Sequence, residues 1–311
     1  MINGSKQKRV LSKRRKDMIF VACLVFVPLM QYFVFYICVN FNSILLAFQQ
    51  YNIGDGETPG RYVFAGFVNF KKIYDEFISD GLILSCVKNS LMFYLINLVV
   101  GTGLGLTFSY YIARKRFASK LFKLILFMPS IISSIVLVTL FKYFANYAVP
   151  QIINNTFGTN VKALISTRQT AFGSIVFYNI WAGFGTAILL YSGAMSNVSE
   201  SVIEAAKIDG AGPVREFIHV VLPLIFPTFK TFIVNGVAIV FASDMCLFSF
   251  FGTDAERYLW TFGYYLLRGA RLASLSEYPY LAAIGVVLTM VCVPLTFSVR
   301  YLLTKYGPSI D

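Results

Sequence analysis

The stretch "VIEAAKIDGAGPVREFIHVVLPL", residues 202–224, decides the fold because it is a charged interruption in a mostly apolar chain. It carries five charged residues, Glu204, Lys207, Asp209, Arg215 and Glu216. Ser199 fits a helix N-cap, glycine at 210 and 212 favours a helix C-terminus, and Pro213 suits the first turn of a new helix. The stretch therefore predicts two short helices, about Glu200–Asp209 and onward from Pro213, before Leu222-Pro223 redirects the chain.

Both predicted helices are shorter than helices that persist alone in water, so they need a surface to pack against. Two surfaces are consistent with the residues alone. The pair of helices could lie in the lipid headgroup region as an amphipathic element, or it could dock on a protein partner.

The composition indicates an integral membrane protein. The 311 residues are 57% hydrophobic and 14% charged, whereas soluble domains carry about 25% charged residues. The net charge of +12 does not indicate nucleic-acid binding, because seven of the 27 basic residues lie within residues 6–16, just before the first apolar run. Such a cluster is a topology signal. With one histidine and no C-x-x-C, the chain has neither a zinc motif nor a His-based triad, and we expect no enzyme activity, no metal and no bound cofactor.

Six apolar segments are long enough to cross a bilayer. They are residues 18–39, 89–113, 121–141, 171–195, 224–251 and 280–301. We expect a basic tail over residues 1–17 and one transmembrane domain over 18–311, with the first span retained rather than cleaved as a signal peptide. Basic residues in the tail and after the second span place both termini and the loop 199–223 in the cytoplasm. The predicted fold is thus an all-α membrane protein with six transmembrane helices.

The interrupting stretch resembles the EAA loop of ABC-importer permeases. That pattern reads E-A-A, three residues, G, nine residues, then I-x-L-P, and the chain has Glu204-Ala205-Ala206, Gly210 and Val220-x-Leu222-Pro223. Only the isoleucine position differs, conservatively, as valine. The "IDGA" at 208–211 is more similar to the carbohydrate-uptake branch than to the amino-acid or peptide branches.

Four further stretches are similar to sugar permeases of the maltose or oligosaccharide type. They are Phe67-Val68-Asn69-Phe70, Lys88-Asn89-Ser90-Leu91, Phe127-Met128-Pro129 with Ser133, and Asn179-x-Trp181-x-Gly183. The resemblance implies a pore built with a second permease and favours a different chain for it. It implies two cytoplasmic ATPases that use ATP-Mg, an external solute-binding protein, and a bacterial or archaeal plasma membrane. It also implies a set of ATPase-coupling residues: Glu204, Ala205, Ala206, Asp209, Gly210, Ala211, Phe217, Leu222 and Pro223.

Asp244 is an acid well inside an apolar run, where a charge is costly unless it meets water, a partner or a ligand. A continuous helix would place Phe241 and Phe248 on the same face. A carboxylate beside aromatic rings suits a sugar, so these residues and Asn179 are candidate solute contacts. The alternatives for Asp244 are that it pairs with a helix of the second permease or that it snorkels near the outer end. The alternative for Asn179 is helix packing. A self-sufficient secondary transporter or channel is the alternative function for the whole chain.

Overall fold

The computed structural model describes residues 13–54, 59–79 and 81–308, and it divides the chain into two compact units. One contains the chain up to Phe70 together with 275–286, and the other contains 71–274 together with the chain from Val287. Most of the predicted basic tail, residues 1–12, lies outside the described residues. Residues 13–17 belong to the first helix rather than to a tail.

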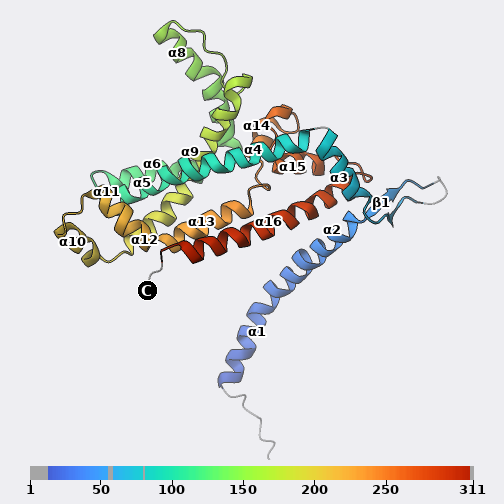
Figure 1. The fold of residues 1–311 in the computed structure, drawn as a ribbon, viewed down its shortest axis with the longest axis horizontal. Helices are drawn as coiled ribbons and strands as arrows, with labels where there is room; N and C mark the ends of the chain where they lie inside the picture. The colour runs from blue at the N-terminus through green and yellow to red at the C-terminus, as the bar shows by residue number, and fades with distance from the viewer. Residues whose placement is uncertain (1–12, 55–58, 80, 309–311) are drawn as a thin grey trace, which may run out of the picture. The chain divides into compact units, whose positions relative to one another are not determined.

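The first unit begins with one long helical rod followed by a small β-hairpin (Figure 1). Its elements are α1 (Lys13–Tyr32), the π-helix η1 (Phe33–Cys38), α2 (Val39–Ala47), β1 (Gln49–Asn52) and β2 (Arg61–Phe64). The two strands pair antiparallel with Gln49 opposite Phe64. Asn69 fixes the corner after the hairpin, since its side-chain amide donates to the carbonyl oxygens of Ala47 (2.9 Å) and Gln49 (2.8 Å).

The second unit holds most of the helices, and two helices cross from one unit to the other. The crossing helices are α3 (Val68–Ser79) and α16 (Tyr278–Tyr306). The elements between these two helices begin with α4 (Leu82–Ile96), η2 (Asn97–Gly101), α5 (Thr102–Ala113), α6 (Ser119–Ile131), α7 (Ser134–Tyr143), η3 (Phe144–Ala148), α8 (Val149–Phe157) and α9 (Arg168–Ser196). They continue with α10 (Glu200–Ile208), α11 (Pro213–Glu216), η4 (Phe217–Val221), α12 (Leu222–Leu224), α13 (Phe226–Ala238), α14 (Leu247–Phe251), η5 (Arg257–Leu259) and α15 (Phe262–Leu272).

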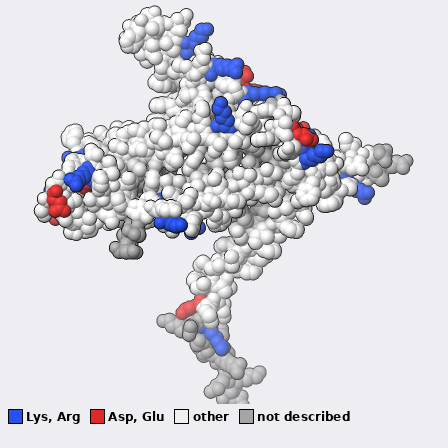
Figure 2. Space-filling model, viewed as in Figure 1, with Lys and Arg blue, Asp and Glu red and all other residues white. Residues whose placement is uncertain are grey.

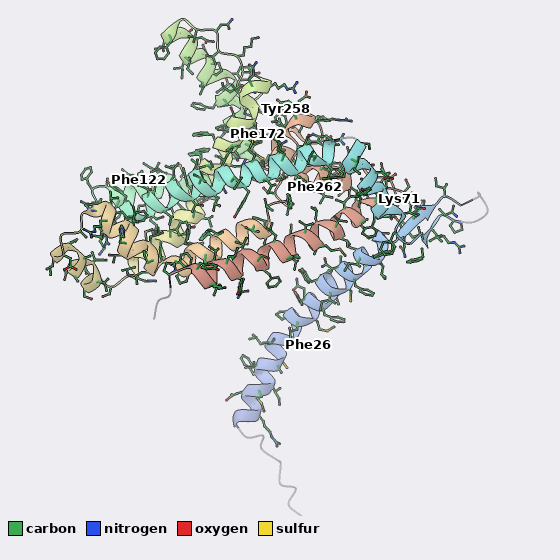
Figure 3. The ribbon with its side chains drawn as sticks, viewed as in Figure 1. Phe26, Lys71, Phe122, Phe172, Tyr258 and Phe262 are labelled. Carbon is green, nitrogen blue, oxygen red and sulfur yellow. The ribbon has the colours of Figure 1, made fainter. Side chains whose placement is uncertain are left out.

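Within the described residues, five helices are long and apolar enough to cross a membrane, and a bent pair raises the number to six. The five are Arg15–Ala47, Leu82–Ala113, Ser134–Phe157, Arg168–Ser196 and Tyr278–Tyr306; the bent pair is Pro213–Leu224 with Phe226–Ala238, at 72°. Apolar side chains cover these helices, as Phe26 on α1 illustrates (Figure 3). The predicted all-helical, multi-span fold is confirmed.

The predicted third span, residues 121–141, is wrong as a continuous helix. Ile132 is extended, and Ser133 occupies the N-cap position of α7, so α6 and α7 are separate helices. Serine competes for backbone groups and favours such caps over helix interiors, and Pro129 has already removed one helical donor from α6. The membrane-length helix instead runs over Ser134–Phe157, into the predicted outer loop.

The predicted fifth span, residues 224–251, is also interrupted. Helix α13 ends at Ala238, and turns occupy residues 239–246 before the five-residue helix α14. Met245 and Cys246 both have positive φ, at 53° and 57°. Non-glycine residues pay a conformational penalty there, so the surrounding structure must hold this break in place.

Candidate functional site

Helix α10 and the turn after it form as the sequence predicts. Gly210 has φ +78° and donates from its N–H to the carbonyl of Lys207 (3.0 Å), while Ala211 donates to Ala206 (2.9 Å). This pair of bonds is the Schellman motif, which satisfies carbonyls left open at the helix end. Ser199 lies at the N-cap position, but its hydroxyl contacts Ser201 (2.7 Å) and makes no cap bond.

The second half of this loop is one helical run, α11–η4–α12, that continues one residue beyond Pro223 and bends at Ile225. Phe217 packs on the Tyr110 ring with centroids 4.9 Å apart. Val221 and Ile225 are buried with Leu106, Tyr191 and Met195 of α5 and α9 in one apolar cluster, against which Leu222 also packs. The run therefore forms the junction between the hairpin and the membrane helices. We call residues 199–225 the hairpin; it lies at the C-terminal end of α5 (Figure 1).

A buried ion pair anchors the hairpin. Glu216 is 3% exposed and forms an ion pair with the Arg114 guanidinium at the end of α5. The Tyr110 hydroxyl donates to Glu216 Oε1 (2.8 Å) and lies 3.1 Å from the Pro213 carbonyl oxygen. Removing one member of a buried pair leaves an uncompensated charge, which typically costs 3–5 kcal/mol. Sequence reasoning missed this role of Glu216. The one feature of the sequence that could have indicated it is that Glu216 is an acid between apolar positions of the second helix.

The predicted coupling residues of α10 and its turn lie on the outside of the hairpin. Glu204, Ala205, Asp209 and Gly210 are exposed, whereas Ala206 and Ala211 are half-buried. Figure 2 shows acidic and basic atoms gathered over this end of the second unit. Glu204 also lines a polar cavity of about 470 Å³ with Arg114, Lys115 and Lys207, between α10 and the ends of α5 and α9.

Two large apolar side chains flank the Gly210 turn without cover. Ile208 is 87% exposed and Val214 is 71% exposed. Ile208 ends α10, which lies between candidate membrane spans, and Val214 lies in the first turn of α11, where the bent candidate span begins; both are at the tip of the anchored hairpin. An apolar pair on a rigid tip is what a protein partner buries at the centre of an interface.

The candidate solute contacts do not form the predicted helical face. Asp244 lies in the break, where its carboxylate accepts from the N–H groups of Cys246 (3.2 Å) and Phe248 (3.4 Å). Phe241 is buried against Phe262, whose ring centroid lies 6.2 Å away, and Phe248 carries the Arg271 guanidinium 5.4 Å from its ring centroid. The expectation of one continuous helix failed because apolar composition alone does not reveal a turn.

Asn179 ties the break to helix α9. Its side-chain amide donates to the Ile175 carbonyl in its own helix (2.8 Å) and to the Met245 carbonyl in the break (3.0 Å). It thus satisfies the carbonyl of Met245, one of the two positive-φ residues.

A second asparagine holds the segment that closes over the break. Asn89 of α4 donates to the carbonyls of Tyr258 (2.8 Å) and Trp260 (2.9 Å), and the next residue, Ser90, accepts from the Phe262 N–H (2.9 Å). Thr261 then donates to the Ser243 carbonyl (2.9 Å). Tyr258 and Phe262 are labelled in Figure 3.

A small pocket opens next to the break, on residues that sequence reasoning did not select. It has a volume of about 190 Å³ between α4–η2 and α13. Polar side chains alternate with aromatic rings in its lining, which includes Tyr94, Asn97, Thr102, Asn235 and Ser243. Asn97 and Asn235 are amides inside apolar runs, and this feature of the sequence could have indicated a polar pocket there.

Fold and site together define a class: multi-pass helical membrane proteins with an anchored helical hairpin ahead of a bent span. The family model of the binding-protein-dependent transport system inner membrane component matches residues 101–307. The chain belongs to this family.

Similar curated proteins include permeases of known transport systems. The chain is 28% identical over 199 residues to the probable ABC transporter permease protein MG188 homolog of Mycoplasma pneumoniae, covering 61% of this chain and 58% of that protein. It is 27% identical to the probable starch degradation products transport system permease protein AmyD of Thermoanaerobacterium thermosulfurigenes (58% and 60% covered). It is 25% identical to the maltose/maltodextrin permease MalF of Escherichia coli (56% and 35%). The chain thus matches about three fifths of the first two relatives and a third of MalF.

A solved structure shares the fold over nearly the whole chain. It is a bacterial ABC transporter involved in the import of the acidic polysaccharide alginate, with a TM-score of 0.77 at 17% identity, covering 94% of this chain and 99% of that one.

Proposed function

We propose that the chain is the permease subunit of an ATP-driven importer for a sugar or oligosaccharide in a bacterial plasma membrane. Family membership over residues 101–307 supports a transport role, and the names of AmyD and MalF support the carbohydrate class. In this proposal the chain forms a pore with a second permease, and ATP-Mg is hydrolysed on separate ATPase subunits. An external binding protein delivers the solute; the alginate importer has been solved with its own periplasmic protein bound.

One observation carries the proposal: the hairpin presents an uncovered apolar pair on a firmly anchored base. The buried Glu216–Arg114 pair and the cluster around Val221 fix the base to α5 and α9. Ile208 and Val214 then offer the tip to a partner. A hairpin with a rigid base and an exposed apolar tip that binds a partner can transmit displacement of that partner to the membrane helices.

In this proposed role the coupling residues have different functions. Glu204 faces basic groups of the ATPase, small Ala205 lets that surface approach closely, and Gly210 makes the turn between Ile208 and Val214. Phe217, Leu222 and Pro223 belong to the base rather than to the docking face.

The solute path in this proposal passes the break. Asp244 is half-buried with its carboxylate oxygens on backbone N–H groups, which leaves acceptor capacity for a sugar hydroxyl. The adjacent pocket, with its amides and Tyr94, has the polar and aromatic lining that suits a carbohydrate.

Reconstitution tests the proposal. Liposomes containing the purified chain alone should take up no solute under a proton or sodium gradient, whereas the complex with its ATPase, second permease and binding protein should import it with ATP. Uptake by the chain alone would establish a secondary transporter or channel instead.

The Glu204→Lys variant tests the docking role of the hairpin. It should insert normally yet lose ATPase association; normal transport by this variant would contradict the docking role.

The side of the hairpin is tested separately. A variant with its five cysteines replaced and Ile208→Cys added should react with a membrane-impermeant thiol reagent only when the cytoplasmic face is open. Labelling from outside in intact cells would overturn the orientation and the coupling role together.

A further inference from the structure

An apolar groove with a basic rim lies on the second unit, at the same end as the hairpin. Its volume is about 510 Å³, within the usual range for small-ligand sites. It is lined by one face of α5, one face of α6 and the loop between them: Thr107, Phe108, Tyr111, Phe117, Leu121 and Ile125. Phe122, labelled in Figure 3, contributes its ring to the floor and meets Phe108 at 5.4 Å between centroids.

The loop that closes this groove is held in a strained conformation. Lys115 and Ala118 have φ of 48° and 53°, in the left-handed region. The Tyr111 hydroxyl donates to the Phe117 carbonyl (2.6 Å), and the Ser119 N–H donates to the Arg116 carbonyl (3.0 Å). These bonds hold the Phe117 side chain 92% exposed at the mouth of the groove. A bulky apolar ring fixed in this way is costly in water but not against hydrocarbon.

The charges at the mouth of the groove have one sign. Lys115, Arg116 and Lys120 are exposed on the loop and the first turn of α6. The sequence contains no aspartate or glutamate from Gly81 to Ser199. Among the described residues, two carboxylates lie near this loop: Glu216 is already paired with Arg114, and Glu204 lines the polar cavity on the Arg114 and Lys115 side. Arg116 and Lys120 therefore have no described carboxylate partner.

We propose that this groove binds an anionic phospholipid. Its phosphate would lie on Arg116 and Lys120, and one acyl chain would run past Phe117 over Leu121 and Ile125. The two helical turns from Ala118 to Ile125 span about 10 Å, which takes the chain from the headgroup level into the hydrocarbon. Charge complementarity favours a lipid over a second permease, since a protein would have to supply acids beside an otherwise apolar face.

The site lies beside the hairpin base. Arg114, which holds Glu216, directly precedes the loop that would hold the headgroup. A bound lipid would therefore fix the α5–α6 loop and, through Arg114, the base of the hairpin. Lipid binding itself requires only that the chain is embedded in a membrane, so it can be measured whether or not the proposed transport function is correct.

Native mass spectrometry of the full chain in mild detergent tests the proposal, with phosphatidylglycerol and phosphatidylcholine of the same acyl chains as probes. We expect phosphatidylglycerol to bind more tightly. Arg116→Gln with Lys120→Gln should weaken it about thirty-fold, the typical effect of two basic residues near an anionic surface. The charge-matched control, Lys162→Gln with Arg257→Gln on exposed residues elsewhere, should bind it like the wild type.

A second variant tests the groove separately from the charges. Ile125→Trp should fill the groove and weaken both lipids, because it blocks the acyl chain and leaves the cations in place. Wild-type binding by Ile125→Trp would reduce the site to a surface charge patch and overturn the proposal. Equal binding of the two lipids, or displacement by millimolar inorganic phosphate, would also overturn it. So would a photo-reactive group at position 117 that cross-links to a partner subunit instead of lipid in the assembled complex.

Discussion

The hairpin and the break at 239–246 both interrupt apolar helical runs, yet they are held in opposite ways. The hairpin is anchored at its base by one buried ion pair and an apolar cluster, and its tip presents Ile208 and Val214 to the outside. In the break, by contrast, the side chains of Asn179 and Thr261 donate to backbone carbonyls, and the Asp244 carboxylate accepts from a backbone N–H. The first region leaves an apolar pair uncovered at its tip, while the second is tied by hydrogen bonds to other elements of the same chain.

This difference agrees with the proposed arrangement, in which the break lies in the bilayer interior and the hairpin at the membrane surface. Backbone groups in a bilayer interior must find internal partners, so a break there needs dedicated side chains. Close contact adds to these bonds, since a Cβ at Gly263 would collide with the Ala242 carbonyl oxygen. Backbone groups of a hairpin at the membrane surface can use water, so its side chains are free to recognise another protein.

Removing the ion pair should have the largest effect on stability. Glu216→Ala leaves the half-buried Arg114 guanidinium, 18% exposed, without its carboxylate, and we expect the free energy of unfolding to fall by up to about 3–5 kcal/mol. Thermal unfolding in detergent measures it. Arg215→Ala, at the exposed neighbouring position, is the control and should change little. If Glu216→Ala unfolds like that control, the pair does not anchor the hairpin.

Asn179→Leu should rank second. It leaves the Met245 carbonyl without its described donor, at a cost of about 1–3 kcal/mol. Ser174→Ala on the same helix removes a bond within one turn (2.9 Å, to Thr170) and should cost less. Equal losses in the two variants would mean that the break does not depend on the tie to α9.

Asp244 variants separate the backbone contacts of this carboxylate from solute contact. Asp244→Ala should cost about 1 kcal/mol because the N–H groups of Cys246 and Phe248 lose their acceptor, whereas Asp244→Asn keeps one acceptor oxygen and should cost less. If the carboxylate also binds solute, both variants should alter solute selectivity in a transport assay. A change in selectivity confined to Asp244→Ala would point to the backbone contacts alone, and loss of the assembled complex to a pairing role.

Ile208→Ser should have the smallest effect on stability, within about 0.5 kcal/mol, because the side chain is exposed. It should nevertheless reduce co-purification of the ATPase. The matched control is Ile53→Ser, which removes another exposed isoleucine, 76% accessible, next to β1. Unchanged co-purification by Ile208→Ser would show that the hairpin tip is not the docking face.

Sequence patterns predicted the hairpin far better than the break. Gly210 and Pro213 determine local geometry through their own backbones, so the turn and both helix ends could be read directly. The ion pair could not, since Arg114 and Glu216 are brought together only by the packing of α11 near α5. The break was invisible to hydropathy, because residues 239–246 are largely apolar and the donors that stabilise it lie on α4, α9 and the segment before α15.

The motif asparagines nonetheless had a shared structural role that the sequence did not disclose. Asn69, Asn89 and Asn179 each donate to two backbone carbonyls. Packing was the alternative interpretation for Asn179, and the structure shows which contacts such packing makes: the amide donates to the Ile175 and Met245 carbonyls. Its contact with solute stays a prediction.

The positions of these donors along the chain also bear on biogenesis. Asn89 and Asn179 precede their distant acceptors, Tyr258, Trp260 and Met245, in sequence. A nascent chain leaves the ribosome from its N-terminus, so both amides are already installed in the bilayer when the irregular segment is delivered. The carbonyls of the irregular segment, which leave the ribosome later, then meet donors that are already in place instead of lipid, and α16 is inserted after them.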